Sequence, residues 1–448
     1  MRNRNSSSMI LFLLGLFSET QIHFVGSLGI AELFIYASAP IMFMVDHQDL
    51  KRNGFMPLLA LALMSCIGCV ISSLHNDTSM QLFLLGFASA YSLFAIPVVL
   101  HHFLWRNLNG LRLFLIGSAI SCIITIFAFT SAAEMAAVAR GGAEDVSSGQ
   151  LYYLVHFGPL SALPLNAFYM NTPTILGVFC YSIPTAYTLI TTTTGRSALV
   201  SFLITFAMIL LTRKSVRRME LLRKHILRFL ALAMLVAISA ASAYKYLALH
   251  NVLTREAREK YEVQTKNRKG LLGLIMGGRS EFFVGLMAAI DQPVYGHGPW
   301  PLDYNGYYEK FIDKYGDAED YQRYKNWQLY LANTYGRHRI GIIPCHSMIV
   351  GNWLFYGILG CPFWFYILFK IFTLLRKHID AIPQWFGYFA CMVPQMAWGI
   401  FFSGYGARMS TGCFITAMLL AMAVGGGKIP LSIEMRREIE SAMVKERG

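Results

Sequence analysis

Three polar residues stand out in a chain that is otherwise strongly apolar, and their types suit the handling of a phosphorylated substrate. Arg196 and Arg279 each follow glycine, and His346 stands directly before a long apolar stretch. Arginine stays charged and binds phosphate oxygens through two N–H groups at once. Histidine can accept a proton near neutral pH. If the fold brings them to one cavity, these residues could bind a phosphate group and take a proton from an attacking hydroxyl.

Each of the three residues also has a structural explanation. Arg196 could mark the membrane interface, with its charged group turned toward water. Arg279 could pair with Glu281 or with a lipid headgroup, and a histidine that stands alone is usually structural. Their common placement favours chemistry, because all three fall on the same predicted face of a membrane, where charged groups are costly unless they are paired or line a cavity.

Other residues of the second half extend this candidate site. The stretch 291–299 holds Gly296 and Gly298 among prolines, which predicts a defined turn rather than a helix. The stretch 304–335 is rich in tyrosine, and such rings suit sugar substrates and membrane headgroups equally. A short basic run near His346 adds further candidates for substrate binding: Arg337, His338 and Arg339.

The scaffold that must position these residues is an integral membrane protein. Of the 448 residues, 55% are hydrophobic and only 14% are charged, whereas soluble proteins have about 25% charged residues. Apolar stretches of about 20 residues, the length that a helix needs to cross a bilayer, recur along the chain. We predict an all-α fold of about 12 transmembrane helices, near 9–27, 29–45, 55–74, 80–103, 113–132, 151–170, 174–190, 196–212, 226–246, 347–372, 385–403 and 407–425.

Lysine and arginine orient these helices. They gather in the short loops of one side, above all in the run 213–224, which places that side and both termini in the cytoplasm. The predicted organisation has transmembrane helices within 1–246 and 347–425, a large outer loop over 247–346 and a cytoplasmic tail over 426–448. We expect this loop to be largely helical, with an amphipathic helix over Leu271–Ile290 at the membrane interface.

Composition and motifs exclude several classes of function. The formal net charge of +13 fits membrane orientation and contact with anionic lipid, and no nucleic-acid-binding motif accompanies it. The chain has no Walker loop for a nucleotide. No acidic pair on the outer side suits a divalent ion, since Asp46 and Asp49 fall on the cytoplasmic side. We therefore expect neither a cofactor nor a metal.

Taken in order, these residues resemble the lipopolysaccharide O-antigen ligase family, within a superfamily that also holds O-antigen polymerases and protein O-oligosaccharyltransferases. The shared marks are Thr194–Ser197 before a span, Gly278–Ser280 with the turn at 293–298, and His346 followed by Tyr356–Gly360. The resemblance covers the topology and the second half of the chain. Ser347 departs from the asparagine that usually follows this histidine in the family.

The resemblance implies a GT-C-like glycosyltransferase architecture and a role in lipopolysaccharide biosynthesis. Such ligases move a polysaccharide from undecaprenyl diphosphate to lipid A–core at the periplasmic face of the Gram-negative inner membrane, without metal or nucleotide. By this resemblance His346 would be the general base, and Arg196 and Arg279 would bind the diphosphate. Direct attack would invert the anomeric centre. The implied partners are the lipid-linked donor, the lipid A–core acceptor and membrane lipid.

Three other functions stay open. An O-antigen polymerase uses the same donor with a growing lipid-linked glycan as acceptor, but such polymerases tend to have two sizeable periplasmic loops, whereas only 247–346 is large here. A protein O-oligosaccharyltransferase would use a protein serine or threonine as acceptor. A transporter or flippase for a lipid-linked sugar would show polar or broken helices near the bilayer midplane and an internal repeat, and the sequence shows no convincing repeat.

Overall fold

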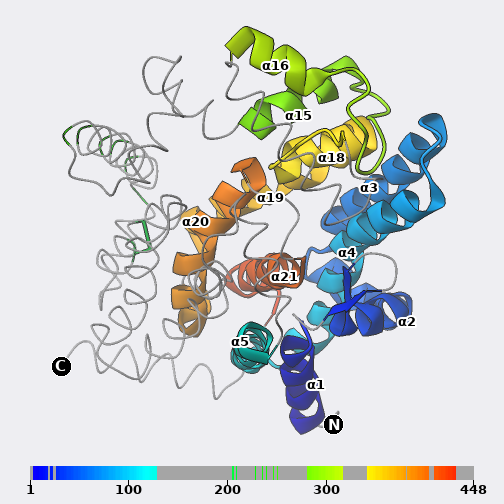
Figure 1. Cartoon of the computed structure of the whole chain (residues 1–448). Coiled ribbons are helices and arrows are strands. Elements are labelled where there is room, and N and C mark those ends of the chain that lie inside the picture. The colour runs from blue at the N-terminus through cyan, green and yellow to red at the C-terminus, as the bar shows by residue number, and fades with distance from the viewer. Residues whose placement is uncertain are drawn as a thin grey trace.

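The regular secondary structure of the described residues is helical apart from one pair of short strands. The computed structural model describes residues 4–18, 21–23, 27–128, 280–315, 341–379, 381–402 and 408–429, together with single positions between 204 and 250. Figure 1 shows α15, α16 and α18 grouped at one end of the molecule, and α1 and α5 at the other end.

The N-terminal helices form one side of the bundle. Their elements are α1 (Arg4–Leu16), β1 (Gln21–His23), β2 (Ser27–Gly29), α2 (Ile30–Arg52), α3 (Met56–His75), α4 (Met80–Leu104) and α5 (Gly110–Ala128). The two strands pair antiparallel, with Gln21 opposite Gly29. Helix α4 packs against α2 and α3, and α1 packs against α5, where the hydroxyls of Ser18 and Ser118 lie 3.2 Å apart.

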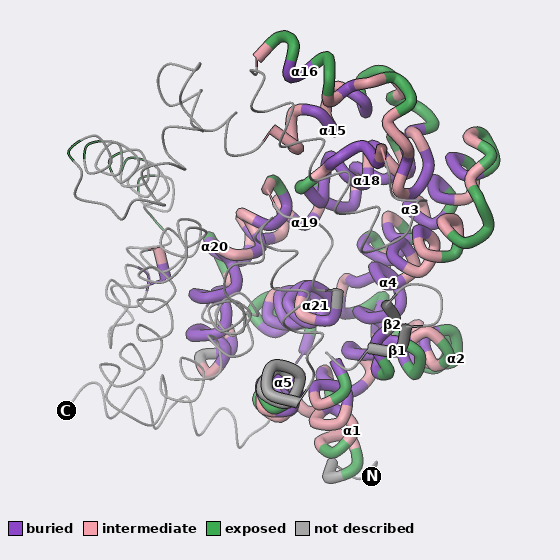
Figure 2. Tube along the Cα trace, in the orientation of Figure 1, coloured by how far each residue is buried: buried purple, intermediate pink, exposed green. Residues whose placement is uncertain are grey.

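The C-terminal elements complete the core, and the first two of them, over 280–291 and 307–315, form a cap. They are α15 (Ser280–Asp291), α16 (Tyr307–Tyr315), α18 (Met348–Tyr356), η2 (Gly357–Gly360), α19 (Cys361–Thr373), η3 (Leu374–His378), η4 (Pro383–Trp385), α20 (Phe386–Phe402) and α21 (Arg408–Gly425). Helix α21 lies centrally and contacts α4, α19 and α20, and Figure 2 shows most of its length as buried.

Several of these helices are apolar enough to place the protein in a membrane. Four segments combine sufficient length and hydropathy to span a bilayer: Ile30–Arg52, Met56–His75, Met80–Leu104 and Met348–His378. Shorter apolar helices accompany them at Ser6–Leu16, Gly110–Ser121, Phe386–Phe402 and Met409–Gly425. The prediction of an all-α, multi-pass membrane protein is confirmed at this level. The number of spans and the GT-C-like architecture stay predictions.

Most predicted spans that fall on described residues match a helix, and two do not match as predicted. The span at 9–27 is wrong, because α1 ends at Leu16 and the strands Gln21–His23 and Ser27–Gly29 pair after it. The span at 347–372 is interrupted by the 3₁₀ turn Gly357–Gly360. The spans at 151–170, 174–190, 196–212 and 226–246 lie outside the continuously described ranges.

Candidate functional site

Helices α15 and α18 lie side by side at the cap. Val284 and Ala288 of α15 pack with Leu354 of α18 and Phe311 of α16 in one buried apolar cluster. The predicted amphipathic helix at 271–290 is therefore present over its described part, and its apolar face covers α18 and α16. Burial of this face fixes the two helices relative to each other.

His346 lies at the start of α18, where the structure gives it a carboxylate partner. Its Nδ1 is 2.6 Å from Oε2 of Glu281, which belongs to the first turn of α15. The His346 side chain is 49% exposed and that of Glu281 is 32% exposed. The imidazole is thus held at one nitrogen while half of its surface stays accessible, so a substrate hydroxyl could reach it.

Ser347 holds the chain beside His346 in place. Its hydroxyl accepts a hydrogen bond from the backbone N–H of Val350, which caps the N-terminus of α18. The same hydroxyl donates to the backbone oxygen of Ile400 in α20, at 3.0 Å. The serine at this position therefore caps α18 and also joins it to α20.

Cys345 precedes this site and is chemically inert at neutral pH. Its sulfur packs against α15, where a methyl group on Gly285 would lie only 2.7 Å from Sγ. Burial, together with the charge of nearby Glu281, raises the pKa of the Cys345 thiol to about 12. The thiol therefore stays protonated under physiological conditions and cannot act as a nucleophile.

We expect Cys345 to resist alkylation although it neighbours the exposed His346. At pH 8 the thiolate fraction of Cys345 should be about 1,000-fold below that of an unperturbed cysteine, and the alkylation rate should rise about tenfold per pH unit up to about pH 11. Mass spectrometry of the peptide that contains Cys345, after timed iodoacetamide treatment, would measure this rate. Labelling at pH 8 as fast as in the unfolded protein would contradict it.

Gly296 and Gly298 occupy a turn at the opposite end of α18 from His346. The rise along α18 from Ser347 to Leu354 is about 10 Å, and His297 N–H donates to the Leu354 carbonyl. Both glycines have positive φ angles, +69° and +82°. The N–H of Gly298 donates to the hydroxyl of Ser72 in α3 at 2.9 Å. The turn thus joins the cap to α18 and α3, and substrate binding by these glycines stays a prediction.

Replacing Gly296 by alanine should destabilise the protein by about 2–5 kcal/mol, because left-handed backbone strain adds to a steric clash. The new methyl group would lie 2.6 Å from the Gly357 nitrogen and 2.7 Å from the Leu354 oxygen. Gly306→Ala is a matched control, since Gly306 has a similar φ of +64° but its nearest neighbour would be 3.5 Å away. Unfolding midpoints in detergent that are equal for the two variants would contradict the expected clash.

The predicted aromatic stretch contributes at least one structural contact. The hydroxyl of Tyr307 donates to the carboxylate of Asp291 and accepts from Asn305. Burial and the bond to Asp291 raise the pKa of Tyr307 to about 12. This tyrosine therefore ties α16 to the end of α15. By contrast, Tyr304 is 87% exposed and remains available for a sugar or a headgroup.

The remaining predicted site residues are Arg196, Arg279, Arg337, His338 and Arg339, and all of them lie outside the described residues. The sequence suggests Glu281 only as a salt-bridge partner of Arg279 and does not predict its bond to His346. The sequence does place Glu281 in the same Gly–Arg–Ser–Glu run as Arg279. No local pattern, however, connects it with a histidine 65 positions away.

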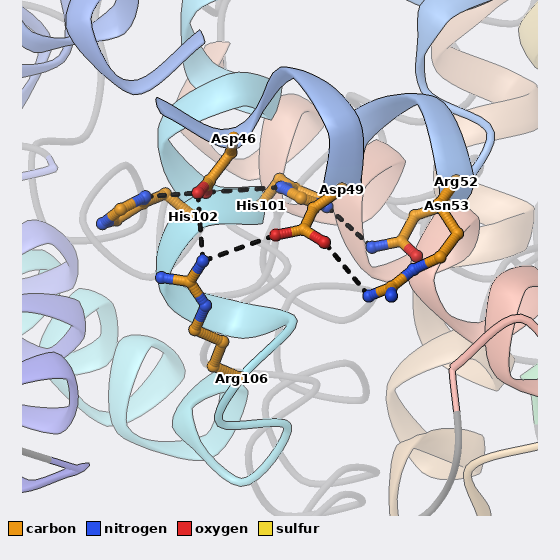
Figure 3. Close-up of polar contacts among 7 residues, drawn as sticks. All are labelled: Asp46, Asp49, Arg52, Asn53, His101, His102 and Arg106. Carbon is orange, nitrogen blue, oxygen red and sulfur yellow. Dashed lines mark hydrogen bonds and ion pairs between the residues drawn. The ribbon is translucent and has the colours of Figure 1, made fainter. Parts of the chain in front are cut away.

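A second polar cluster lies at the other end of the helices, where α2 and α4 terminate. Figure 3 shows Asp46 as its centre. The Asp46 carboxylate is bound by Nδ1 of His102 at 2.7 Å and by Arg106 at 3.1 Å, and Nδ1 of His101 lies 4.0 Å away. The Asp46 side chain is only 1% exposed. A buried carboxylate is tolerated here because cationic and N–H groups surround it.

Further ion pairs extend this cluster toward the surface. Arg106 also contacts Asp49, and Asp49 pairs with Arg52 at 3.1 Å. Fully buried His101 bonds through Nε2 to the side-chain amide of Asn53. The cluster lies about 24 Å along α4 from Gly86, whose carbonyl accepts a hydrogen bond from Tyr356 at the end of α18. It therefore fastens α2 to α4, well away from the cap.

Sequence reasoning set Asp46 and Asp49 aside and so missed this cluster. Spacing gives a partial indication, since Asp46 and Asp49 are three residues apart and His102 and Arg106 are four apart, so each pair shares one helix face. Among the described residues, no group of three His, Cys, Asp or Glu side chains could hold a metal ion. Independence from metal stays a prediction.

Comparison of the chain with models of known protein families and with curated protein sequences finds no match. Function is therefore inferred from the residues and from their geometry.

Proposed function

We propose that this protein is a membrane-embedded glycosyltransferase of the O-antigen ligase type, which transfers a polysaccharide from undecaprenyl diphosphate to lipid A–core. The observation that carries this proposal is the setting of His346. Its half-exposed imidazole lies at the start of the long apolar segment Met348–His378 and contacts α15, the helix that directly follows Arg279 in the chain. The proposed proton acceptor thus contacts a helix whose first residue follows Arg279 in the chain, which supports a role for Arg279 in the same site.

In the proposed reaction, an acceptor hydroxyl of lipid A–core attacks the anomeric carbon of the donor sugar. His346 takes the hydroxyl proton, the new glycosidic bond forms, and the bond between the anomeric carbon and the diphosphate oxygen breaks. Undecaprenyl diphosphate leaves with that electron pair. Arg196 and Arg279 bind the diphosphate and stabilise the charge that develops on it. A single displacement of this kind inverts the anomeric configuration.

The described polar pairs favour an enzyme over a transporter. A transporter site is expected near the bilayer midplane, where broken helices offer free backbone groups. At the interruption Gly357–Gly360, a backbone group is already bonded to another part of the chain. The N–H of Ile358 donates to the carbonyl of Val294. His346 with Glu281, and Asp46 with His102, both lie at helix ends instead.

Complementation tests the proposed function. The chain would be expressed in a Gram-negative host that lacks its own O-antigen ligase and carries the matching core, beside a vector control. We expect an O-antigen ladder attached to lipid A–core on a gel. Restored glycan length in a polymerase-null host, without ligation in the ligase-null host, would replace ligase by polymerase. No transfer in either matched host, at a verified membrane abundance, would overturn the glycosyltransferase proposal.

A further inference from the structure

We propose that Glu281 is the positioning residue of the general base, and that its carboxylate holds His346 in the tautomer whose Nε2 accepts the substrate proton. This inference rests on the proposed function for the identity of the substrate proton. The bond itself, between Glu281 Oε2 and His346 Nδ1, is a feature of the fold.

The chemistry of the two groups sets the direction of this bond. An ionised carboxylate only accepts hydrogen bonds, so the proton in the bond belongs to Nδ1 of His346. A neutral imidazole carries one proton, so in this tautomer the lone pair that can take up a proton is on Nε2. The N···O distance of 2.6 Å is short, as expected when the acceptor is an ionised carboxylate. Glu281 thereby selects which nitrogen can act as the base.

Both partners are held by independent packing. Glu281 belongs to the first turn of α15, whose Phe282 ring lies 5.7 Å from the Phe402 ring at the end of α20. His346 directly precedes Ser347, which is bonded to α18 and to α20. The pair therefore bridges elements that are already fixed, so the direction of the imidazole is set before substrate arrives.

The charge of Glu281 also matters for the reaction. Taking the substrate proton turns His346 into an imidazolium, and an adjacent carboxylate stabilises that cation. The neighbouring helices α18 and α20 contain no Asp, Glu, Lys or Arg, and burial keeps the Cys345 thiol protonated by raising its pKa to about 12. The Glu281 carboxylate, in direct contact with Nδ1, is therefore placed to act on this imidazole.

The test compares wild type with Glu281→Gln in purified, nanodisc-embedded protein, with undecaprenyl-diphosphate-linked glycan as donor and lipid A–core as acceptor. We expect kcat to fall about 10–100-fold, with both KM values nearly unchanged. The acidic limb of the pH profile should move to lower pH, because loss of the carboxylate makes the imidazole easier to deprotonate. Glu309→Gln is the same change at an exposed position of α16 in the same cap, and it should leave the kinetics unchanged.

A double variant separates positioning from an independent role in substrate binding. In a His346→Ala background, Glu281→Gln should lower the residual rate no further, since there is no imidazole left to orient. A reduction by the same factor in both backgrounds would overturn the positioning role. Normal kinetics of Glu281→Gln beside an inactive His346→Ala would also overturn it, while leaving the proposed function intact.

A readout without substrate completes the test, so that failure of the proposed function does not hide the outcome. Nitrogen-15 NMR of labelled histidine, with His346→Ala used to assign the signal, reports which ring nitrogen carries the proton. We expect a protonated Nδ1 and an unprotonated Nε2 in wild type at high pH, and a mixture of both tautomers in Glu281→Ala. The same tautomer in both proteins would overturn the inference, whatever reaction the protein catalyses.

Discussion

Replacing His346 by alanine is expected to lower the rate of glycan transfer by about 10²–10⁴-fold, which is the usual contribution of a general base. The acceptor hydroxyl would then have to lose its proton to water, while the arginines and the binding surfaces stay in place. The loss should therefore appear in kcat, with the KM of the donor nearly unchanged. A single-turnover assay in nanodiscs, with product resolved on a gel, measures the chemical step directly.

His75→Ala is the matched control for this prediction. His75 is also a histidine near the cap, where its ring stacks on Tyr295 at 4.3 Å between ring centroids. It lies at the end of α3 rather than at the start of α18. A rate for His346→Ala within about threefold of wild type would remove the general base from the mechanism. A loss of similar size in His75→Ala would point to damage of the cap instead.

The long helices could be predicted because length and hydropathy alone specify them. The stretches near 55–74, 80–103 and 385–403 become α3, α4 and α20 with nearly the predicted ends, since an apolar run of about 20 residues has few alternatives in lipid. The break at Gly357–Gly360 depends on a turn that docks from a remote part of the chain, through Val294 and Gly296. Local hydropathy does not report such a contact.

The residues of the candidate site also divide into those that the sequence identifies and those that only tertiary contacts identify. His346 could be singled out because a polar, titratable residue directly before an apolar stretch is visible in the sequence. Its partner Glu281 could not, because their bond connects two helices that are far apart in the chain. The contact between Asp46 and His102 likewise joins α2 to α4. Residue types suggest which groups do chemistry, whereas tertiary packing decides which groups meet.

Asp46→Asn is expected to cost about 3–5 kcal/mol of stability, the usual effect of removing one partner from a buried ion pair. The substitution keeps the side-chain shape but leaves Arg106 and His102 beside a neutral amide, in a site where Asp46 is only 1% exposed. The amide can accept a bond from one of them, but it cannot balance the charge of the guanidinium. Denaturant or thermal unfolding in a fixed detergent would measure the change.

Asp49→Asn is the matched control, because Asp49 makes the same type of ion pair with Arg106 but its side chain is 26% exposed. Water screens that pair, so we expect a cost of about 0–1 kcal/mol. The double variant Asp46→Asn with Arg106→Gln should be less destabilised than the sum of its single changes, because it removes both charges together. An equal loss of stability in Asp46→Asn and Asp49→Asn would show that burial does not strengthen the interaction of Asp46 with His102 and Arg106. The contrast between the two aspartates therefore tests whether this cluster, rather than helix packing alone, fastens α2 to α4.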